Sequence, residues 1–251
     1  DRLRSRGLGD VYKRQEEYQD VDQLNDSDKN VIKEALDLRD RYGGTVDVIG
    51  FGPLSAEDVM KEALTYGIDN AFLINDPQFA DMDISQTARI VAAGIKKLGP
   101  YDLVLCGRQA IDGDSAHMAS MTSCALEIPL IAYSDEITEM KEGSVFATCM
   151  GDQMAYNVEA KMPAMILSIR EKNKNRFPSV PDIMKTYDGT YKTKILTNDE
   201  LDISVTKRKV TQLRKYEVKS SKQQKLVMIS GKDEEEKAAQ VLQLLKQKSV
   251  I

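Results

Sequence analysis

Short apolar runs alternate with amphipathic stretches in the first half of this chain, and this alternation constrains the fold more than any other feature. The runs at 45–51, 71–74 and 103–106 have the length and composition of strands. The stretch between the last two runs repeats its apolar side chains at helical spacing, at Ile84, Ala88, Val91, Ile95 and Leu98. A β-α repetition predicts parallel strands joined by right-handed crossovers, and therefore a doubly wound α/β fold with a mostly parallel sheet.

The pattern changes after Pro129, where apolar runs follow one another with only short polar turns between them. Glu142-Gly143-Ser144 and Gly151-Asp152 are typical hairpin turns. The apolar runs cover residues 130–133, 136–140, 145–150, 154–160 and 164–169. We therefore expect an antiparallel extension of the same domain.

Composition argues against several classes of protein. The formal net charge of −5 speaks against a nucleic-acid binder held by bulk electrostatics. No apolar run approaches the roughly 18 residues of a membrane span. The three cysteines, Cys106, Cys124 and Cys149, have no metal-binding spacing, and a catalytic triad would have to be built around His117 alone. We expect a cytoplasmic protein with reduced thiols, no nucleic-acid partner and no membrane span.

Residues 101–123 form the stretch most suited to binding a ligand. Leu103-Val104-Leu105-Cys106 predicts a buried strand, Gly107 ends it, and a polar loop leads to Ser115, the predicted N-cap of a helix. Open α/β sheets bind ligands at the carboxyl ends of their strands, and the free N–H groups of a helix start attract anions. The loop matches neither the dinucleotide fingerprint nor the P-loop, so a plain connection without a ligand is the alternative.

The residues of this loop add a more specific signal. Gly-Arg-Gln-Ala-Ile-Asp-Gly-Asp-Ser, residues 107–115, closely resembles the nucleotide-binding segment of the electron-transfer flavoprotein β subunit. The resemblance extends over roughly residues 20–215. It implies an adenine-nucleotide α-hydrolase-like domain at 20–206, followed by a C-terminal arm at 207–251.

The same resemblance implies cofactors and partners. The chain would be one subunit of a heterodimer, with FAD held mainly by the α subunit between the two chains. This subunit would hold AMP or a second FAD, and the sequence leaves that choice open. Because the flavin carries the redox chemistry, no catalytic side chain is expected in this chain.

The residues around the nucleotide follow from the resemblance as well. Backbone N–H groups of 115–119 would meet a phosphate, Arg108 would offset a diphosphate, and Asp112 would fix the loop or bind a ribose hydroxyl. Asn25 matches a family asparagine near the nucleotide, and residues 50–53 match the turn beside the adenine. The expected cofactor-binding set is Asn25, Phe51, Gly52, Gly107, Arg108, Asp112, Asp114, Ser115, Ala116, His117, Met118, Ala119 and Ser120.

Two positions depart from the family pattern. His117 stands where relatives commonly carry glutamine, and Ala119 where they commonly carry glycine. A ring nitrogen of His117 can still donate a hydrogen bond, whereas the methyl group of Ala119 makes close backbone approach to a phosphate less favourable. For His117, an exposed or satisfied residue in the first helical turn is the alternative to a ligand contact.

Residues 173–185 form a second landmark. Two prolines, Pro178 and Pro181, predict that no continuous helix begins until after Pro181. The segment resembles the recognition loop that inserts an aliphatic side chain into an acyl-CoA dehydrogenase. Packing of this loop on its own domain is the alternative. The expected docking residues are Val180, which occupies the anchor position, with Pro181, Ile183 and Met184.

The two ends of the chain differ from the middle. Residues 1–19 have no apolar period, and we expect 1–15 to be foreign sequence rather than a genuine arm. The family's first strand is not recognisable, and in this fold it would lie mid-sheet beside the strand at 103–106. Residues 234–248 predict an amphipathic helix that needs a surface to cover its apolar face, either on the α subunit or on its own domain.

Two other classes of function fit the same fold. One is an adenine-nucleotide-binding enzyme that hydrolyses or transfers the nucleotide, although the carboxylate pair Asp112 and Asp114 has no nearby lysine. The other is a nucleotide sensor or scaffold without a redox role.

Overall fold

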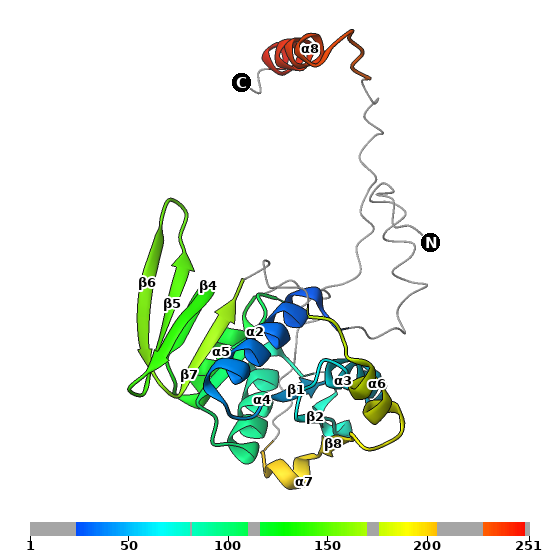
Figure 1. Cartoon of the computed structure of the whole chain (residues 1–251), viewed down its shortest axis with the longest axis vertical. Helices are drawn as coiled ribbons and strands as arrows, with labels where there is room; N and C mark the ends of the chain where they lie inside the picture. Colours follow the sequence, from blue (N-terminus) through cyan, green and yellow to red (C-terminus); the bar gives the residue numbers. More distant parts are fainter. Residues whose placement is uncertain (1–23, 81, 110–115, 170–175, 205–227, 249–251) are drawn as a thin grey trace. The chain divides into compact units, whose positions relative to one another are not determined.

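The computed structural model describes residues 24–80, 82–109, 116–169, 176–204 and 228–248. The chain divides into two compact units, Asp1–Lys209 and Val210–Ile251. The first unit contains two sheets with helices around them, and the second contains one described helix (Figure 1). The predicted boundaries at residues 19 and 206 stay predictions.

Sheet A is entirely parallel. Its strands are β1 (Asp47–Phe51), β2 (Asn70–Ile74) and β8 (Thr193–Leu196), in the order β1-β2-β8. β2 lies in the middle and buries Ala71, Leu73 and Ile74. These strands are joined by helical crossovers, as the β-α repetition predicts.

Sheet B is mixed, with the order β3-β7-β4-β5-β6. β7 is parallel to β3 on one side and to the start of β4 on the other, and the pairs β4–β5 and β5–β6 are antiparallel. The strands are β3 (Leu103–Cys106), β4 (Leu130–Lys141), β5 (Ser144–Met150), β6 (Ala155–Lys161) and β7 (Ala164–Ser168).

The expected α/β class is therefore confirmed, but the antiparallel extension is smaller than predicted. Residues 130–131 and 164–168 belong to the parallel part of sheet B. All five residues of β7 are buried, which is typical of a central parallel strand with both faces covered. Short polar turns before these runs made them look like hairpin strands in the sequence.

The helices begin and end where local signals allow. Asn25, Asp83 and Ser179 cap α2, α4 and α6 by accepting hydrogen bonds from backbone N–H groups of the first turn. The described helices are α2 (Asp26–Tyr42), α3 (Glu57–Leu64), α4 (Ile84–Leu98), α5 (Met118–Leu126), α6 (Val180–Tyr187), α7 (Asn198–Leu201) and α8 (Glu234–Gln247), with short 3-10 turns at Leu54–Ala56 and Pro77–Phe79.

Helix α6 begins earlier than the sequence predicts. It starts at Val180 and carries Pro181 in its first turn. A proline is tolerated there because the N–H that it lacks would have no partner within the helix. The prediction that Pro181 delays the helix was therefore wrong.

Helix α2 packs against both sheets. Leu38 joins a cluster with Ile131 and Ile166 of sheet B, whereas Ile32 and Leu36 pack beside Val48 of sheet A. In Figure 1, α2 lies between the strands of the two sheets. Helix α2 therefore contributes side chains to the cores of both sheets.

β1 and β3 are edge strands among the described residues. β1 pairs only with β2, and β3 pairs only with β7. Tyr101, just before β3, donates its hydroxyl to Asp47 Oδ2 at 2.7 Å, so the amino ends of the two strands are linked through side chains. Burial, together with this carboxylate, raises the pKa of Tyr101. The expectation that a further strand belongs beside β3 stays a prediction, and the edge of β3 that faces away from β7 is compatible with it.

The second unit contains α8, which begins one residue after its N-cap Asp233. Asp233 Oδ1 accepts a 2.8 Å hydrogen bond from the N–H of Glu236. Val241 and Leu242 are exposed in this unit, which agrees with the amphipathic pattern in the sequence. In the part of the chain that the structure describes, no helix is both long enough and apolar enough to cross a membrane.

Candidate functional site

The carboxyl end of β3 meets the amino end of α2. Asn25 caps α2 through its Oδ1, which accepts from the N–H of Ser27 at 3.3 Å. The Nδ2 of the same side chain donates to the carbonyl of Gln109 at 2.7 Å. Asn25 therefore anchors the Gly-Arg-Gln loop to the start of a helix 84 residues away.

Asp28 provides a second anchor for this loop. The N–H of Gly107 donates to Asp28 Oδ1 at 3.0 Å. A Cβ atom at residue 107 would lie 2.4 Å from that oxygen and 2.6 Å from Ser27 Oγ. Since real Cβ atoms do not approach so closely, only glycine fits at residue 107 without movement of the Ser27 and Asp28 side chains.

The electrostatics at this junction reflect burial. Burial raises the pKa of Asp28, while the hydrogen bonds from Gly107 and Asn25 act in the opposite direction. Burial and the neighbouring Asp28 also raise the pKa of the Cys106 thiol to about 12. Cys106 lies 3.7 Å from the carbonyl oxygen of Ile166, to which its thiol donates, and it is protonated at neutral pH. It is therefore a packing residue rather than a nucleophile.

Helix α5 supplies free backbone donors. Its N-cap is His117, two residues later than the predicted cap Ser115. Ala116 has a φ of 53°, in the left-handed region, and this conformation ends the loop before the helix begins. The first intrahelical bond runs from the N–H of Met121 to the carbonyl of His117 at 3.0 Å.

The N–H groups of the first turn of α5 therefore have no acceptor within the helix. These groups belong to Met118, Ala119 and Ser120, three of the predicted binding residues. Ala119 is buried, whereas His117 and Ser120 are exposed. The positive end of the helix dipole and these donors suit a phosphate. Asp112, Asp114 and Ser115 lie outside the described residues.

The remaining predicted residues lie at two other places. Arg108 is exposed next to the anchored Gly107. Phe51 is the last residue of β1 in sheet A, and Gly52 follows it; the ring of Phe51 packs against Phe79 with centroids 6.2 Å apart. The Asn75 side chain donates to the carbonyl of Gly52 at 2.8 Å. The contacts of Asn25 with Gln109 and of Asp28 with Gly107 are thus separate from the contact that holds this turn.

Sequence reasoning missed three residues of these contacts as site residues. They are Ser27, Asp28 and Asn75. The spacing of Asn25 and Asp28 was an available signal, because residues three apart lie on the same face of a helix start. No comparable pattern pointed to Asn75, whose contact depends on the pairing of β1 with β2.

A second surface lies on α6. Val180, Ile183, Met184 and Tyr187 recur at helical spacing and are all exposed, with Val180 at 69% and Met184 at 64%. Phe177, just before the helix, is 74% exposed. Thr186, on another side of the helix, is buried. The alternative that this segment buries its apolar side chains on its own domain does not hold for the described residues 177–187.

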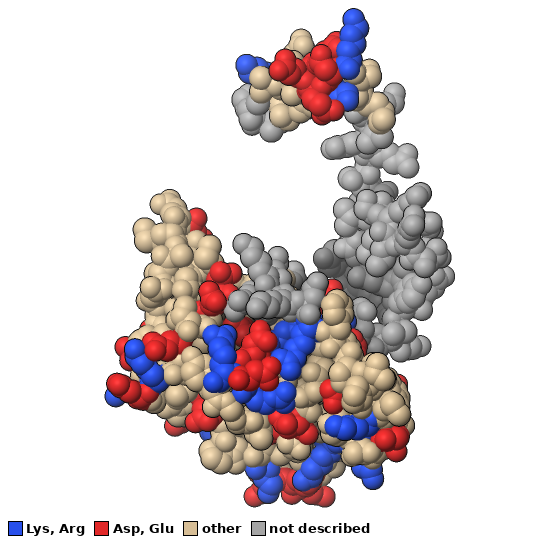
Figure 2. Space-filling view, in the orientation of Figure 1, with Lys and Arg blue, Asp and Glu red and all other residues tan. Residues whose placement is uncertain are grey.

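The surroundings of α6 are polar. Figure 2 shows acidic and basic side chains gathered over α2, while the surface over α6 is mostly uncharged and bordered by charge. An exposed apolar patch with a polar rim is typical of an interface. Among the described residues, no cluster of His, Cys, Asp or Glu could hold a metal ion.

Together, the parallel strands and the anchored loop before α5 define an open α/β domain of the kind that binds ligands at the carboxyl ends of its strands. The sequence matches the electron transfer flavoprotein domain over residues 16–195, which is most of the chain. The chain therefore belongs to the electron transfer flavoprotein family.

Several relatives share extended similarity. An electron transfer flavoprotein subunit beta of Clostridium acetobutylicum is 36% identical over 91% of this chain and 87% of the relative. A protein of the same name from Thermoanaerobacterium thermosaccharolyticum is 37% identical over 72% of this chain and 68% of the relative. The caffeyl-CoA reductase-Etf complex subunit CarD of Acetobacterium woodii is 37% identical over 66% of this chain and 63% of the relative. These relatives identify the chain as a β-subunit-like member with a role in electron transfer.

Proposed function

We propose that this chain is the β subunit of a heterodimeric electron transfer flavoprotein. It holds AMP or a second FAD and passes electrons between dehydrogenases, such as an acyl-CoA dehydrogenase, and a redox acceptor. The observation that carries the proposal is the double anchoring of the Gly-Arg-Gln loop to α2 by Asn25 and Asp28. The location proposed for the complex is the cytoplasm.

The described residues fit a phosphate group at this place. Gly107 leaves no room for a side chain, so the backbone of the loop lies close against α2. Ser27 Oγ is buried and has no hydrogen-bond partner among the described residues. The N–H groups of Met118, Ala119 and Ser120 would receive the phosphate oxygens, and the exposed Arg108 would offset their charge.

The proposed role of this chain is positioning. A bound flavin would supply the electron-accepting chemistry, mainly in the α subunit. The side chains of this subunit would fix the nucleotide and present α6 to an electron donor. The apolar stripe at Val180, Ile183 and Met184, with Pro181, would insert into an acyl-CoA dehydrogenase or a similar flavoenzyme. The C-terminal unit with α8 would contact the α subunit.

The test of cofactor binding uses the complete complex. The chain is expressed together with its α subunit, and the bound cofactors are released by denaturation and identified. One flavin with AMP per heterodimer, or two flavins, would support the proposal and would decide between AMP and a second FAD. A heterodimer that carries neither adenylate nor a second flavin would contradict it. ATP turnover that Asp112→Ala abolishes would instead favour the enzyme alternative.

The docking surface has its own test. Val180→Asp places a charge at the N-terminal end of the stripe, at the proposed anchor position, and is expected to slow electron delivery from the dehydrogenase, without loss of bound nucleotide. Met154→Asp is a matched control. Met154 is 70% exposed, about as much as Val180, but it lies in the turn between β5 and β6. Unchanged transfer rates in Val180→Asp would remove the docking assignment.

A further inference from the structure

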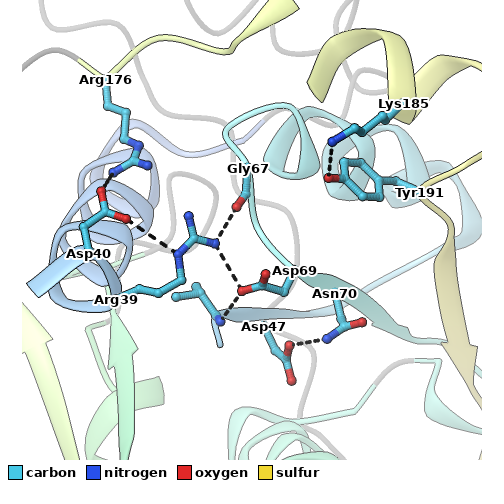
Figure 3. Close-up of polar contacts among 10 residues, drawn as sticks. Arg39, Asp40, Asp47, Gly67, Asp69, Asn70, Arg176, Lys185 and Tyr191 are labelled. Carbon is cyan, nitrogen blue, oxygen red and sulfur yellow. Dashed lines mark hydrogen bonds and ion pairs between the residues drawn. The ribbon is translucent and has the colours of Figure 1, made fainter. Parts of the chain in front are cut away.

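The apolar segment on α6 is tied to the rest of the domain by an ion pair. Arg176 directly precedes Phe177, and its Nη1 donates to Asp40 Oδ2 at 2.8 Å (Figure 3). The same nitrogen lies 3.6 Å from Asp37 Oδ1. Both carboxylates belong to α2, and because they are three residues apart, they lie on one face of that helix. One guanidinium thus contacts two carboxylates of α2.

A second contact fixes the start of α6 itself. Ser179 caps the helix by accepting from the N–H of Asp182 at 3.1 Å. The Asp182 carboxylate lies against the turn at Gly67, where an added Cβ would be 3.3 Å from Asp182 Oδ2. The carbonyl of Gly67 accepts a 2.8 Å hydrogen bond from Arg39 Nη1. The turn that supports α6 is therefore itself held by α2.

The two contacts meet on α2. Asp40 Oδ1 lies 3.8 Å from Arg39 Nε, so Asp40 stands between Arg39 and Arg176 (Figure 3). Arg39 also pairs with Asp69 at 3.2 Å. A helix of 17 residues spans about 25 Å, and at its other end Asn25 holds the candidate nucleotide loop. One helix therefore supports both candidate functional regions.

We propose that Arg176, clamped by Asp37 and Asp40, is the positioning residue of the docking segment at residues 177–187. It holds the apolar stripe in the orientation in which a flavoenzyme partner binds. The inference rests on the proposed docking function of α6 and adds to it the element that preorders the surface.

The exposure of the ion pair sets the kind of effect to expect. The side chains of Arg176, Asp37 and Asp40 are 29%, 40% and 55% exposed. Pairs of this kind contribute little to global stability. They can nevertheless lower the entropic cost of ordering a segment when a partner binds. Loss of the clamp should therefore weaken docking and leave folding unchanged.

The experiment measures electron transfer in the heterodimer with the α subunit, with an acyl-CoA dehydrogenase as donor. In Arg176→Ala, the KM for the dehydrogenase is expected to rise about three- to ten-fold with little change in kcat, because an already ordered loop binds more tightly. The nucleotide content and the Tm should match the wild type. The double variant Asp37→Asn/Asp40→Asn should show the same rise in KM. Arg176→Lys keeps the positive charge, so its KM should rise less than that of Arg176→Ala.

A charge reversal separates the ion pair from other effects of substitution. Arg176→Asp alone should raise KM at least as much as Arg176→Ala, and adding Asp37→Lys and Asp40→Lys should recover part of the loss. Arg41→Ala is the matched control, because Arg41 is an exposed arginine at the same end of α2 and belongs to none of these contacts. Its KM should equal that of the wild type.

Two outcomes overturn the proposal, and they differ from failure of the docking function. An unchanged KM in Arg176→Ala, while Val180→Asp still impairs transfer, would show that the stripe docks without the clamp. A fall in Tm or in nucleotide content that matches the rise in KM would show a structural role instead. If neither Arg176→Ala nor Val180→Asp changed transfer, the docking function of α6 itself would fail.

Discussion

The side-chain amide of Asn25 donates a 2.7 Å hydrogen bond to the backbone carbonyl of Gln109, and the oxygen of the same amide caps α2. One side chain thus begins a helix and fixes the loop that follows β3. Asparagine is suited to both contacts because its amide carries a donor and an acceptor on one rigid plane. An aspartate at this position would keep the acceptor and lose the donor.

This relationship predicts the effect of Asn25→Asp. The cap on α2 should persist, while the loop loses its donor and a carboxylate faces the Gln109 carbonyl. Loss of one partly buried hydrogen bond of this kind costs about 1 kcal/mol. The nucleotide content of the purified heterodimer should fall, whereas the helical signal in circular dichroism should stay unchanged. Asn70→Asp, which removes a surface amide donor to Asp47, should retain its nucleotide. Full nucleotide content in Asn25→Asp would contradict the anchoring role.

A second prediction concerns Gly107→Ala. The new methyl group would meet Ser27 Oγ and Asp28 Oδ1 at distances that no Cβ tolerates. The Ser27 and Asp28 side chains must then move, and overpacking of this kind costs about 1–3 kcal/mol. Chemical denaturation should show that loss, and Ser27→Gly in the same chain should recover part of it.

Gly52→Ala provides the control for that substitution. The nearest atom to a Cβ at residue 52 is the Ala56 Cβ at 3.5 Å, an ordinary contact. The midpoint of denaturation should therefore stay close to the wild-type value. Equal losses at the two glycines would show that the Gly107 junction is not specially tight.

A third prediction follows from the raised pKa of Asp28. Burial lifts this pKa above its ordinary value of 3.8. At a pH between the unfolded and the folded pKa, the Asp28 carboxyl therefore keeps its proton in the folded protein and has lost it in the unfolded chain. The contribution of Asp28 to the free energy of unfolding is therefore largest below about pH 3.8 and falls as the pH rises through the higher folded pKa. Asp28→Asn removes this titration. Over that pH window, the free energy of unfolding of the variant should therefore fall less than that of the wild type.

The change in the free energy of unfolding at neutral pH is a weaker readout for Asp28→Asn. A carboxylate in the first turn of a helix gains about 0.3–1 kcal/mol from the helix dipole, which opposes the cost of burial. Denaturation at several pH values therefore tests the assignment better than a single measurement. Identical pH slopes for Asp28→Asn and the wild type would show that Asp28 does not titrate with a raised pKa.

A fourth prediction concerns the thiols. Burial raises the pKa of Cys106 to about 12 and raises that of Cys149 as well, whereas Cys124 is exposed. Since the thiolate is the reactive form, iodoacetamide should modify Cys124 first in the folded protein. Cys149 is buried and Cys106 is half-buried with a raised thiol pKa, so both should react more slowly than Cys124, as mass spectrometry of peptides can show. Rapid labelling of Cys106 or Cys149 in the folded Cys124→Ser variant would contradict the raised pKa values of these thiols.

The sequence predicted the class of fold because its main signals are local. The apolar run at 103–106 matches β3, and the helical spacing from Ile84 to Leu98 matches α4. The family could be recognised from residues 107–115 and is supported by the match over 16–195. Such signals depend on neighbouring residues and on composition, which a single sequence contains.

Contacts between distant residues could not be predicted in the same way. The parallel pairing of β4 with β7 joins residues 130–131 to 165–166, and no local pattern states that register. The contacts of Asp28 with Gly107 and of Arg176 with Asp40 likewise depend on how α2 lies across the domain. The cap of α5 was misplaced because the left-handed conformation of Ala116 has no signature in its residue type.

The pairing of the strands leads to a last prediction, on hydrogen exchange. β2 lies between β1 and β8, and β7 lies between β3 and β4, whereas β1 and β3 each pair on one side among the described residues. In a parallel pair, alternate N–H groups of a strand point to opposite sides, so an edge strand leaves about half of its amides without a partner in the sheet. The amides of Asn70–Ile74 and Ala164–Ser168 should therefore be protected more completely than those of Asp47–Phe51 and Leu103–Cys106. Mass spectrometry of exchanged peptides measures this difference. Equal protection of β1 and β2, and of β3 and β7, would contradict the edge positions and would mean that another strand covers both edges in solution.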